Sequence, residues 1–221
     1  MRIVCDFDGT ITRADTVDAV LEQLADPRWR DLEAQWMANE ITAAACMRGQ
    51  VALIDPSEGR LEAVLDQVEL DPDFTAFVDW CEARGHEIAV VSDGVDYFIH
   101  KILARHGLDR LPVIANRLIR GQAFALDQPW SKPGCAASSG VCKCAAARQD
   151  DRGLLIYVGD GRSDFCVSAD ADILFAKASL AAYAAGRGQA FHPYETFDDV
   201  TRTLSRLLEP QPVALATRLA S

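Results

Sequence analysis

Residues 3–11 read IVCDFDGTI, an apolar run that passes directly into two aspartates and a glycine. Ile3 and Val4 favour a β-strand, whereas the Asp-Gly pair favours a turn, so a strand is predicted to end here. Residues two apart in a strand face the same side, so Asp6 and Asp8 are expected to converge on one cation or one substrate. The alternative is an ordinary junction between a strand and a turn, without a chemical role.

The rest of the chain alternates strand-like and helix-like segments. Five short β-rich runs cover residues 2–6, 87–92, 112–116, 154–158 and 172–176. This alternation predicts an α/β protein with a Rossmann-like parallel sheet flanked by helices. The first two runs are separated by residues 7–86, far more than one crossover needs, which predicts a small helical cap inserted after the first strand.

Helical periodicity gives approximate domain boundaries. Val17, Val20 and Leu21 follow the spacing of one buried helix face, and Phe74 begins a second such helix that returns the chain to the core before Gly85. We therefore expect a catalytic core at residues 1–14 and 76–208 and a cap at 15–75. The tail at 209–221 contains two prolines and is expected to be loose.

Composition limits the possible partners. Of the 221 residues, 49% are hydrophobic and 25% are charged, which is typical of a globular protein. The net charge of −11 argues against a nucleic-acid partner, because phosphate affinity depends on clustered Lys and Arg. No signal segment or membrane-length apolar run is visible, so we expect a cytoplasmic protein without a membrane partner. The sequence does not indicate the oligomeric state.

Seven cysteines are present, and three of them cluster at Cys135, Cys142 and Cys144. Their spacing lacks the paired C-x-x-C pattern of a zinc site. A loop of reduced thiols is therefore favoured over a metal site, and the role of this loop stays open.

Polar side chains follow three of the predicted strands at the point where each strand ends. Ligands of open parallel sheets bind beyond the carboxyl ends of the strands, so these residues are expected to meet at one edge. They are Asp6 and Asp8 after the first run, Ser92, Asp93 and Gly94 after the second, and Asp160 and Asp164 after the fourth. Four carboxylates would repel one another unless a hard dication, most simply Mg²⁺, bound their oxygens.

Lys143 is expected at the start of the helix before the fourth of these strands, close to the same edge. A carboxylate, a dication, a hydroxyl and a lysine together meet the needs of phosphoryl transfer, which depends on positioning and charge neutralisation. Each residue also has an ordinary alternative: turn carboxylates for the aspartates, a helix N-cap for Asp164 and a surface position for Lys143.

In this order, DFDGT (6–10), SDG (92–94), the lone Lys143 and GDGRSD (159–164) resemble the four-motif signature of the haloacid dehalogenase superfamily of phosphatases. The resemblance implies that Asp6 is a nucleophile that becomes an aspartyl-phosphate. It implies that Asp8 is the general acid and base, and that its backbone carbonyl binds Mg²⁺. For this chemistry Asp8 must be protonated while Asp6 is ionised, so we expect their titrations to be split.

The same resemblance implies roles for the remaining motif residues. Ser92 and the backbone N–H of Asp93 would hold phosphoryl oxygens, with Gly94 beside them, and Lys143 would stabilise developing charge. Asp160 would bind the metal directly, and Asp164 would orient the metal or its waters. A receiver-type phospho-acceptor domain is disfavoured, because it has neither a second aspartate at this spacing nor a cap.

The cap resembles the phosphoserine-phosphatase subclass, although Gln50 stands where those enzymes carry an Arg for the substrate carboxylate. Asp15 falls where they carry a Glu for the substrate amine, but a helix N-cap role is favoured here. The later stretches GVCK, YVGDGRSDFC and HPYETFDDV resemble 2-hydroxy-3-keto-5-methylthiopentenyl-1-phosphate phosphatases of methionine salvage. Phosphoethanolamine and phosphocholine phosphatases share parts of this pattern.

These resemblances imply a Mg²⁺-dependent phosphatase that hydrolyses a small phosphorylated metabolite, possible substrates being the methylthiopentenyl phosphate, phosphoserine, phosphoethanolamine and phosphocholine. A phosphotransferase to an alcohol acceptor is the alternative, because the same residues would serve it. The candidates for recognising the leaving group are Trp36, Arg48 and Gln50, and Asp15 is a further one. Packing is an alternative role for Trp36.

Overall fold

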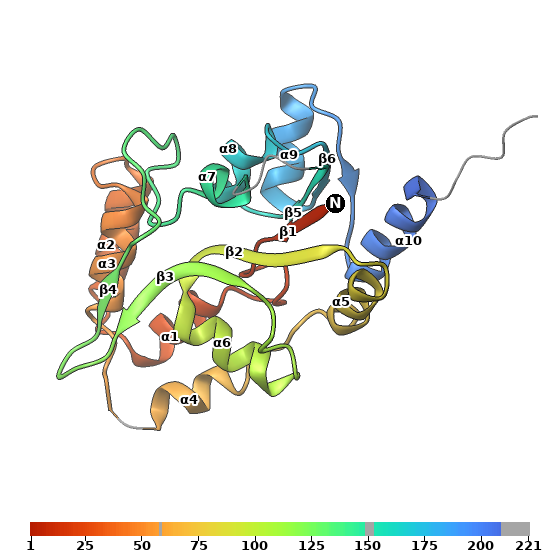
Figure 1. The fold of residues 1–221 in the computed structure, drawn as a ribbon. Coiled ribbons are helices and arrows are strands. Elements are labelled where there is room, and N and C mark those ends of the chain that lie inside the picture. The colour runs from red at the N-terminus through yellow and green to blue at the C-terminus, as the bar shows by residue number, and fades with distance from the viewer. Residues whose placement is uncertain (58, 149–152, 209–221) are drawn as a thin grey trace, which may run out of the picture.

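The computed structural model describes residues 1–57, 59–148 and 153–208, which form an α/β fold around one sheet (Figure 1). Its strands are β1 (Arg2–Cys5), β2 (Glu87–Val95), β3 (Val113–Ile119), β4 (Ala125–Asp127), β5 (Leu155–Gly159), β6 (Ile173–Ala176) and β7 (His192–Pro193). They lie in the order β4-β3-β2-β1-β5-β6-β7. All neighbours pair in parallel except β3 and β4. The expected fold class is confirmed.

All five predicted strands are present, and β2 and β3 continue to Val95 and Ile119, beyond their expected ends. The edge strands β4 and β7 were not predicted, because they have only three and two residues. Pro193 is tolerated there because β7 is an edge strand that pairs on one side only.

Helices cover both faces of the sheet. They are α1 (Thr16–Leu24), α2 (Trp29–Met37), α3 (Ala43–Val51), α4 (Arg60–Leu65), α5 (Phe74–Ala83), α6 (Asp96–Arg105), α7 (Lys143–Ala147), α8 (Phe165–Ser168), α9 (Ala178–Gly186) and α10 (Phe197–Leu208). Alternation in β1 directs Ile3 and Cys5 to one core and Val4 to the other. Helices α1, α4, α5, α6 and α10 contribute to the first core, and α7, α8 and α9 to the second.

The inserted helices divide into two groups. Helices α1 and α4 pack together and share the core of α5 and α6, so burial of their apolar faces stabilises the main fold. Helices α2 and α3 form a hairpin beside β4 (Figure 1). In α2 only Trp29 is buried. We propose that this hairpin is the part of the expected cap, residues 15–75, that faces a ligand. The tail expected at 209–221 lies outside the described residues.

Local signals in the sequence account for several helix ends. The carboxylate of Asp15 accepts a hydrogen bond of 2.9 Å from the backbone N–H of Asp18, which confirms its role as the N-cap of α1. Gly85, with φ of 67°, lies in the left-handed region directly after α5, where glycine is favoured. Within the described ranges, no helix has the length and apolar character needed to cross a membrane.

Candidate active site

The loop after β1 lies at the centre of the sheet, where β1 is flanked by β2 and β5. The strands that follow β1 in the sequence are added first on one side of it (β2 to β4) and then on the other (β5 to β7). Ligands of open α/β sheets bind beyond the strand ends at such a point. Strand β1 ends at Cys5, so Asp6 and Asp8 both lie in the loop. The strand alternation invoked for Asp8 therefore does not apply, and local hydrogen bonds position it instead.

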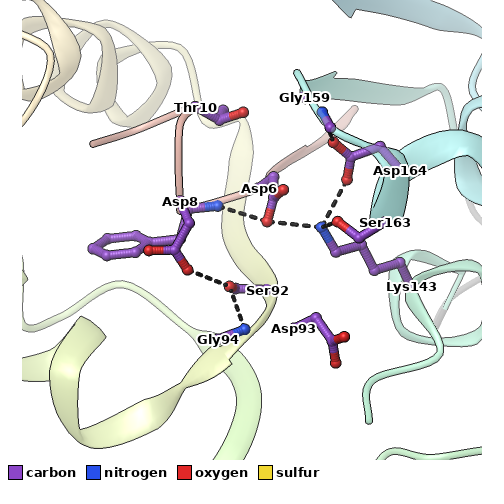
Figure 2. A network of polar contacts seen from close by, with 12 residues as sticks. Asp6, Asp8, Thr10, Ser92, Asp93, Gly94, Lys143, Gly159, Ser163 and Asp164 are labelled. Carbon is purple, nitrogen blue, oxygen red and sulfur yellow. Dashed lines mark hydrogen bonds and ion pairs between the residues drawn. The ribbon is translucent and has the colours of Figure 1, made fainter. Parts of the chain in front are cut away.

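Asp6 and Lys143 form a buried ion pair. The Nζ of Lys143 lies 2.7 Å from Oδ1 of Asp6 and 2.7 Å from Oδ1 of Asp164 (Figure 2). The Lys143 side chain is 1% exposed. Burial lowers the pKa of Lys143, but the charges of Asp164 and Asp6 outweigh this effect and raise its pKa above the ordinary value. The lysine is therefore a fixed positive charge between two carboxylates.

Asp164 is fully buried and holds the loop after β5 in place. Its Oδ1 accepts hydrogen bonds of 2.6 Å from the Tyr157 hydroxyl and 2.7 Å from Lys143. Its Oδ2 accepts 3.0 Å bonds from the backbone N–H groups of Asp160 and Gly161. Because both oxygens are occupied by donors within the chain, the carboxylate orients this loop. Its side chain does not cap α8, the alternative role considered for it.

Asp160 is the third carboxylate of a group that could hold a cation. One oxygen from each of Asp6, Asp160 and Asp164 lies within 4.8 Å of the others, and the described residues contain no second group of this kind. Thr10 donates a 2.6 Å hydrogen bond to Oδ1 of Asp160. A Cβ at Gly9 would lie 2.6 Å from Oδ2 of Asp160, so glycine leaves room for this carboxylate. Hard oxygen donors with an uncompensated negative charge fit Mg²⁺.

The last part of β2, where its pairing with β3 shifts register between Val91 and Val95, lies opposite Asp8. The Ser92 hydroxyl donates to Oδ2 of Asp8 at 3.5 Å and accepts a 2.9 Å hydrogen bond from the backbone N–H of Gly94 (Figure 2). Asp93 holds this irregular part of β2 in place, because its Oδ1 accepts a 2.9 Å hydrogen bond from the backbone N–H of Val141 and a 3.2 Å hydrogen bond from Asn116. The Asp93 side chain therefore has a structural role, and a ligand role for its backbone N–H stays a prediction.

Asp8 accepts a 2.9 Å hydrogen bond from the backbone N–H of Thr16, at the start of α1. Burial, with the charge of Asp15 adding to it, raises the pKa of Asp8 to about 7. Burial and the neighbouring Asp164 also raise the pKa of Asp6, against the opposing effect of Lys143. The expected split of the two titrations stays a prediction, because it depends on a cation beside Asp6.

A cavity of about 790 Å³ opens above these residues. Asp15, Trp36 and Gln50 line it, as do Ser92, Asp93 and Gly94. Gln50 is 4% exposed, and its amide donates a 2.9 Å hydrogen bond to Glu33. Arg48 is not among the lining residues; it is exposed and donates to Gln128 instead. The structure thus brings together the expected residues of the three strand ends but leaves Arg48 outside.

Several residues that support the site were missed in the sequence. Tyr157 lies inside an apolar strand, where an aromatic residue is ordinary, and Asn116 follows the apolar residues 113–115 of β3. Ser163, which accepts a 2.9 Å hydrogen bond from Lys143, lies within GDGRSD (159–164). Thr10, which donates to Asp160, lies within DFDGT (6–10). Position within those motifs was therefore the one usable signal.

Comparison with known proteins agrees with this arrangement. Residues 3–168 match the family model described as haloacid dehalogenase-like hydrolase. The chain is 29% identical over 93% of its length to a 2-hydroxy-3-keto-5-methylthiopentenyl-1-phosphate phosphatase of Brevibacillus brevis, covering 95% of that protein. It is 30% identical over 90% of its length to the Exiguobacterium sp. protein of the same name, again covering 95% of it.

Among solved structures, a phospho-aspartyl intermediate analogue of phosphoserine phosphatase matches with a TM-score of 0.65. The match covers 93% of this chain and 97% of that one, at 20% sequence identity. At this identity the match shows a shared fold.

Proposed function

The chain belongs to the haloacid dehalogenase-like hydrolases, and on this basis we propose that it is a Mg²⁺-dependent phosphatase that works through an aspartyl-phosphate on Asp6. Its curated relatives support a phosphoric monoester hydrolase that acts on small phosphate esters. The observation that carries the mechanism is the buried ion pair of Asp6 with Lys143, at the carboxyl ends of the parallel strands and below the cavity. A carboxylate fixed in this way has one orientation from which to attack.

In the proposed first step, the Asp6 carboxylate attacks phosphorus in line, and the bond from phosphorus to the leaving alcohol breaks. Asp8 donates a proton to the leaving oxygen. The Ser92 hydroxyl and the backbone N–H of Asp93 hold phosphoryl oxygens. In the second step Asp8 takes a proton from water, which attacks phosphorus and releases inorganic phosphate and the Asp6 carboxylate.

The proposed metal ligands are the carboxylates of Asp6 and Asp160 and the backbone carbonyl of Asp8. When bound, Mg²⁺ supplies positive charge that offsets repulsion between the phosphoryl group and these carboxylates. Asp164 keeps the Asp160 loop in position through its four hydrogen bonds. The fixed positive charge of Lys143 stabilises the negative charge on the oxygens of the phosphoryl group during its transfer.

The experiment that tests this function is phosphate release from an aryl phosphate and from small alkyl phosphates, with Mg²⁺ and with EDTA. We expect release that EDTA abolishes and Mg²⁺ restores. In Asp160→Asn, the Mg²⁺ concentration for half-maximal rate should rise at least about tenfold, because a direct ligand is weakened. Activity that persists at full rate in EDTA would contradict the metal assignment.

Asp8→Asn should slow phosphate release from alkyl phosphates by about 10²–10⁴-fold, since the leaving alkoxide loses its proton donor. In the first turnover, alcohol release from an aryl phosphate, whose leaving group needs less protonation, should be slowed less. With a pKa of about 7, native Asp8 loses its proton as pH rises, so the alkyl rate should fall above about pH 7. The measurements are alcohol release from both esters in the first turnover and the pH–rate profile of the native protein, and equal losses for the two esters in that first turnover would contradict the role of Asp8 as the acid.

The names of these relatives favour the methylthiopentenyl phosphate of methionine salvage as one candidate substrate. A carboxylate-bearing substrate such as phosphoserine is less favoured, because Gln50 has no charge to offer it. Transfer to an alcohol acceptor is tested by adding glycerol and looking for glycerol phosphate. The cytoplasmic location and the absence of a nucleic-acid partner stay predictions.

A further inference from the structure

Tyr194 is a buried polar residue that the proposed mechanism does not use. It directly follows β7 and lies in the stretch HPYETFDDV (192–200). Tyr194 is 3% exposed and is not among the residues that line the cavity. A role in the reaction would therefore be exerted through the residues that Tyr194 contacts.

The hydroxyl of Tyr194 contacts the peptide group that leads to Asp160. It donates a 3.3 Å hydrogen bond to the backbone carbonyl of Gly159, the last residue of β5. The backbone N–H of Lys177 also donates to this carbonyl, at 3.3 Å, so among the described residues Tyr194 is the one side chain that does so. The N–H of the same peptide group, on Asp160, donates to Oδ2 of Asp164 at 3.0 Å. Hydrogen bonds thus hold both polar atoms of the peptide group before the proposed metal ligand.

The other polar groups of Asp160 are held as well. Its backbone carbonyl accepts hydrogen bonds of 2.9 Å from the N–H of Leu180 and 3.2 Å from the Ser179 hydroxyl, at the start of α9. Its carboxylate accepts the bond from Thr10. Because the backbone is fixed on both sides of the Asp160 Cα, the direction of its carboxylate depends on the orientation of the Gly159 peptide group.

The ring of Tyr194 is itself held by two neighbours. The Nζ of Lys177, which follows β6, lies 4.9 Å from the centre of the ring. Such a contact between an ammonium group and a ring is attractive. The ring of Phe197, the first residue of α10, is tilted against it with centroids 6.2 Å apart. The hydroxyl therefore keeps one position relative to Gly159.

The backbone beside Lys177 supplies a second, independent observation. Ala178 has a φ of 45°, in the left-handed region that residues other than glycine seldom adopt. A conformation of this kind costs free energy and persists where the surrounding contacts hold it, commonly near functional sites. Its neighbours Lys177 and Ser179 both donate to the loop of Asp160. The strained turn thus lies where the chain supports that loop.

From these contacts we propose that Tyr194 is a positioning residue for the metal: its hydroxyl fixes the Gly159 peptide group and, through it, the Asp160 carboxylate. The inference rests on the proposed function, in which Asp160 binds Mg²⁺ directly. Removing a group that orients a metal ligand weakens metal binding. Because this hydrogen bond joins two neutral groups, its loss should weaken Mg²⁺ binding by about three- to tenfold.

The test compares Tyr194→Phe with Tyr97→Phe. Tyr194→Phe removes the hydroxyl and keeps the ring beside Lys177. Tyr97→Phe also removes one phenol hydroxyl, which donates at 2.6 Å to Glu62 and lies outside the cavity lining. Mg²⁺ binding is measured by isothermal titration calorimetry without substrate. We expect the Kd for Mg²⁺ to rise about three- to tenfold in Tyr194→Phe and to keep its native value in Tyr97→Phe.

The phosphatase assay gives a second readout. In Tyr194→Phe, the Mg²⁺ concentration for half-maximal rate should rise by the same factor as the Kd. The kcat at saturating Mg²⁺ and the KM for an aryl phosphate should stay near their native values, because Tyr194 does not line the cavity. A role in folding alone would instead lower the urea midpoint in EDTA and leave the Kd for Mg²⁺ unchanged.

Failure of this inference can be distinguished from failure of the proposed function. If the native protein releases no phosphate from any ester with Mg²⁺ present, the phosphatase function is contradicted. If the native protein is active and Tyr194→Phe keeps the native Kd for Mg²⁺, the positioning role is overturned and the function stands. An equal rise of the Kd in Tyr97→Phe would also overturn the positioning role. Absence of Mg²⁺ binding by the native protein would overturn both.

Discussion

Asp6→Asn is expected to reduce phosphate release by at least about 10⁴-fold, because a neutral amide is a far weaker nucleophile toward phosphorus than a carboxylate. The shape of the side chain is kept, and Asp6 is buried, so a loss of this size would come from chemistry at one atom. The hydrogen bond from the backbone N–H of Phe7, 2.8 Å in the native chain, can form with the amide oxygen. The measurement is a single-turnover rate with an aryl phosphate and saturating Mg²⁺.

The matched control is Asp109→Asn, at an exposed position before β3 and outside the cavity lining. It should keep the native rate, and both variants should unfold cooperatively at similar denaturant concentrations. Retention of more than about one hundredth of the native rate by Asp6→Asn would contradict its role as nucleophile.

Lys143→Met should affect both stability and rate. Without the ammonium group, the buried carboxylates of Asp6 and Asp164 are left unpaired, which should lower the free energy of unfolding by about 3–5 kcal/mol in metal-free buffer. Phosphate release should fall by about 10²–10³-fold, because a fixed charge at the reacting oxygens is lost. Urea denaturation and the phosphate assay measure the two effects.

The pH dependence has a definite sign. Burial raises the pKa of Asp6 in the folded state and Lys143 opposes this effect, so removing Lys143 raises the pKa of Asp6 further above its unfolded value. Such groups are protonated in the folded state at low pH, so the loss of stability should be small near pH 5 and grow as pH rises to 8. Mg²⁺ should restore part of the stability, since it binds the folded state.

The control for this variant is Lys101→Met, on the exposed side of α6. We expect its stability to lie within about 0.5 kcal/mol of the native value. If Lys143→Met were as stable as Lys101→Met at pH 8 without metal, the buried ion pair would not have the charge state that the mechanism requires.

Much of this fold could be predicted from the sequence. The apolar runs that became β1, β2 and β5 are bounded by turn residues, and their carboxyl ends lie together because parallel strands point the same way. The polar residues beyond these ends were therefore found without a structure. The N-cap role of Asp15 was predictable for a similar reason, because it depends on neighbours in the sequence.

Contacts between distant segments were not predictable in this way. Arg48 and Gln50 are two residues apart, yet the orientation of α3 directs Gln50 into the cavity and Arg48 to Gln128 of the segment after β4. The short strand β4, which packs beside α3, carries no periodic signal. Asn116 on β3 likewise donates a hydrogen bond to Asp93 on the neighbouring strand β2, a contact that only the register of the sheet creates.

The most direct test of the central claim is a search for phosphate on Asp6. The protein with Mg²⁺ and an excess of an aryl phosphate is quenched in acid within one turnover and reduced with borohydride, which converts an aspartyl-phosphate to homoserine. We predict that peptide mass spectrometry will find homoserine at position 6 in the native protein and none in a sample without substrate. Turnover without any modification of Asp6, or phosphate found on Ser92 instead, would contradict the proposed mechanism.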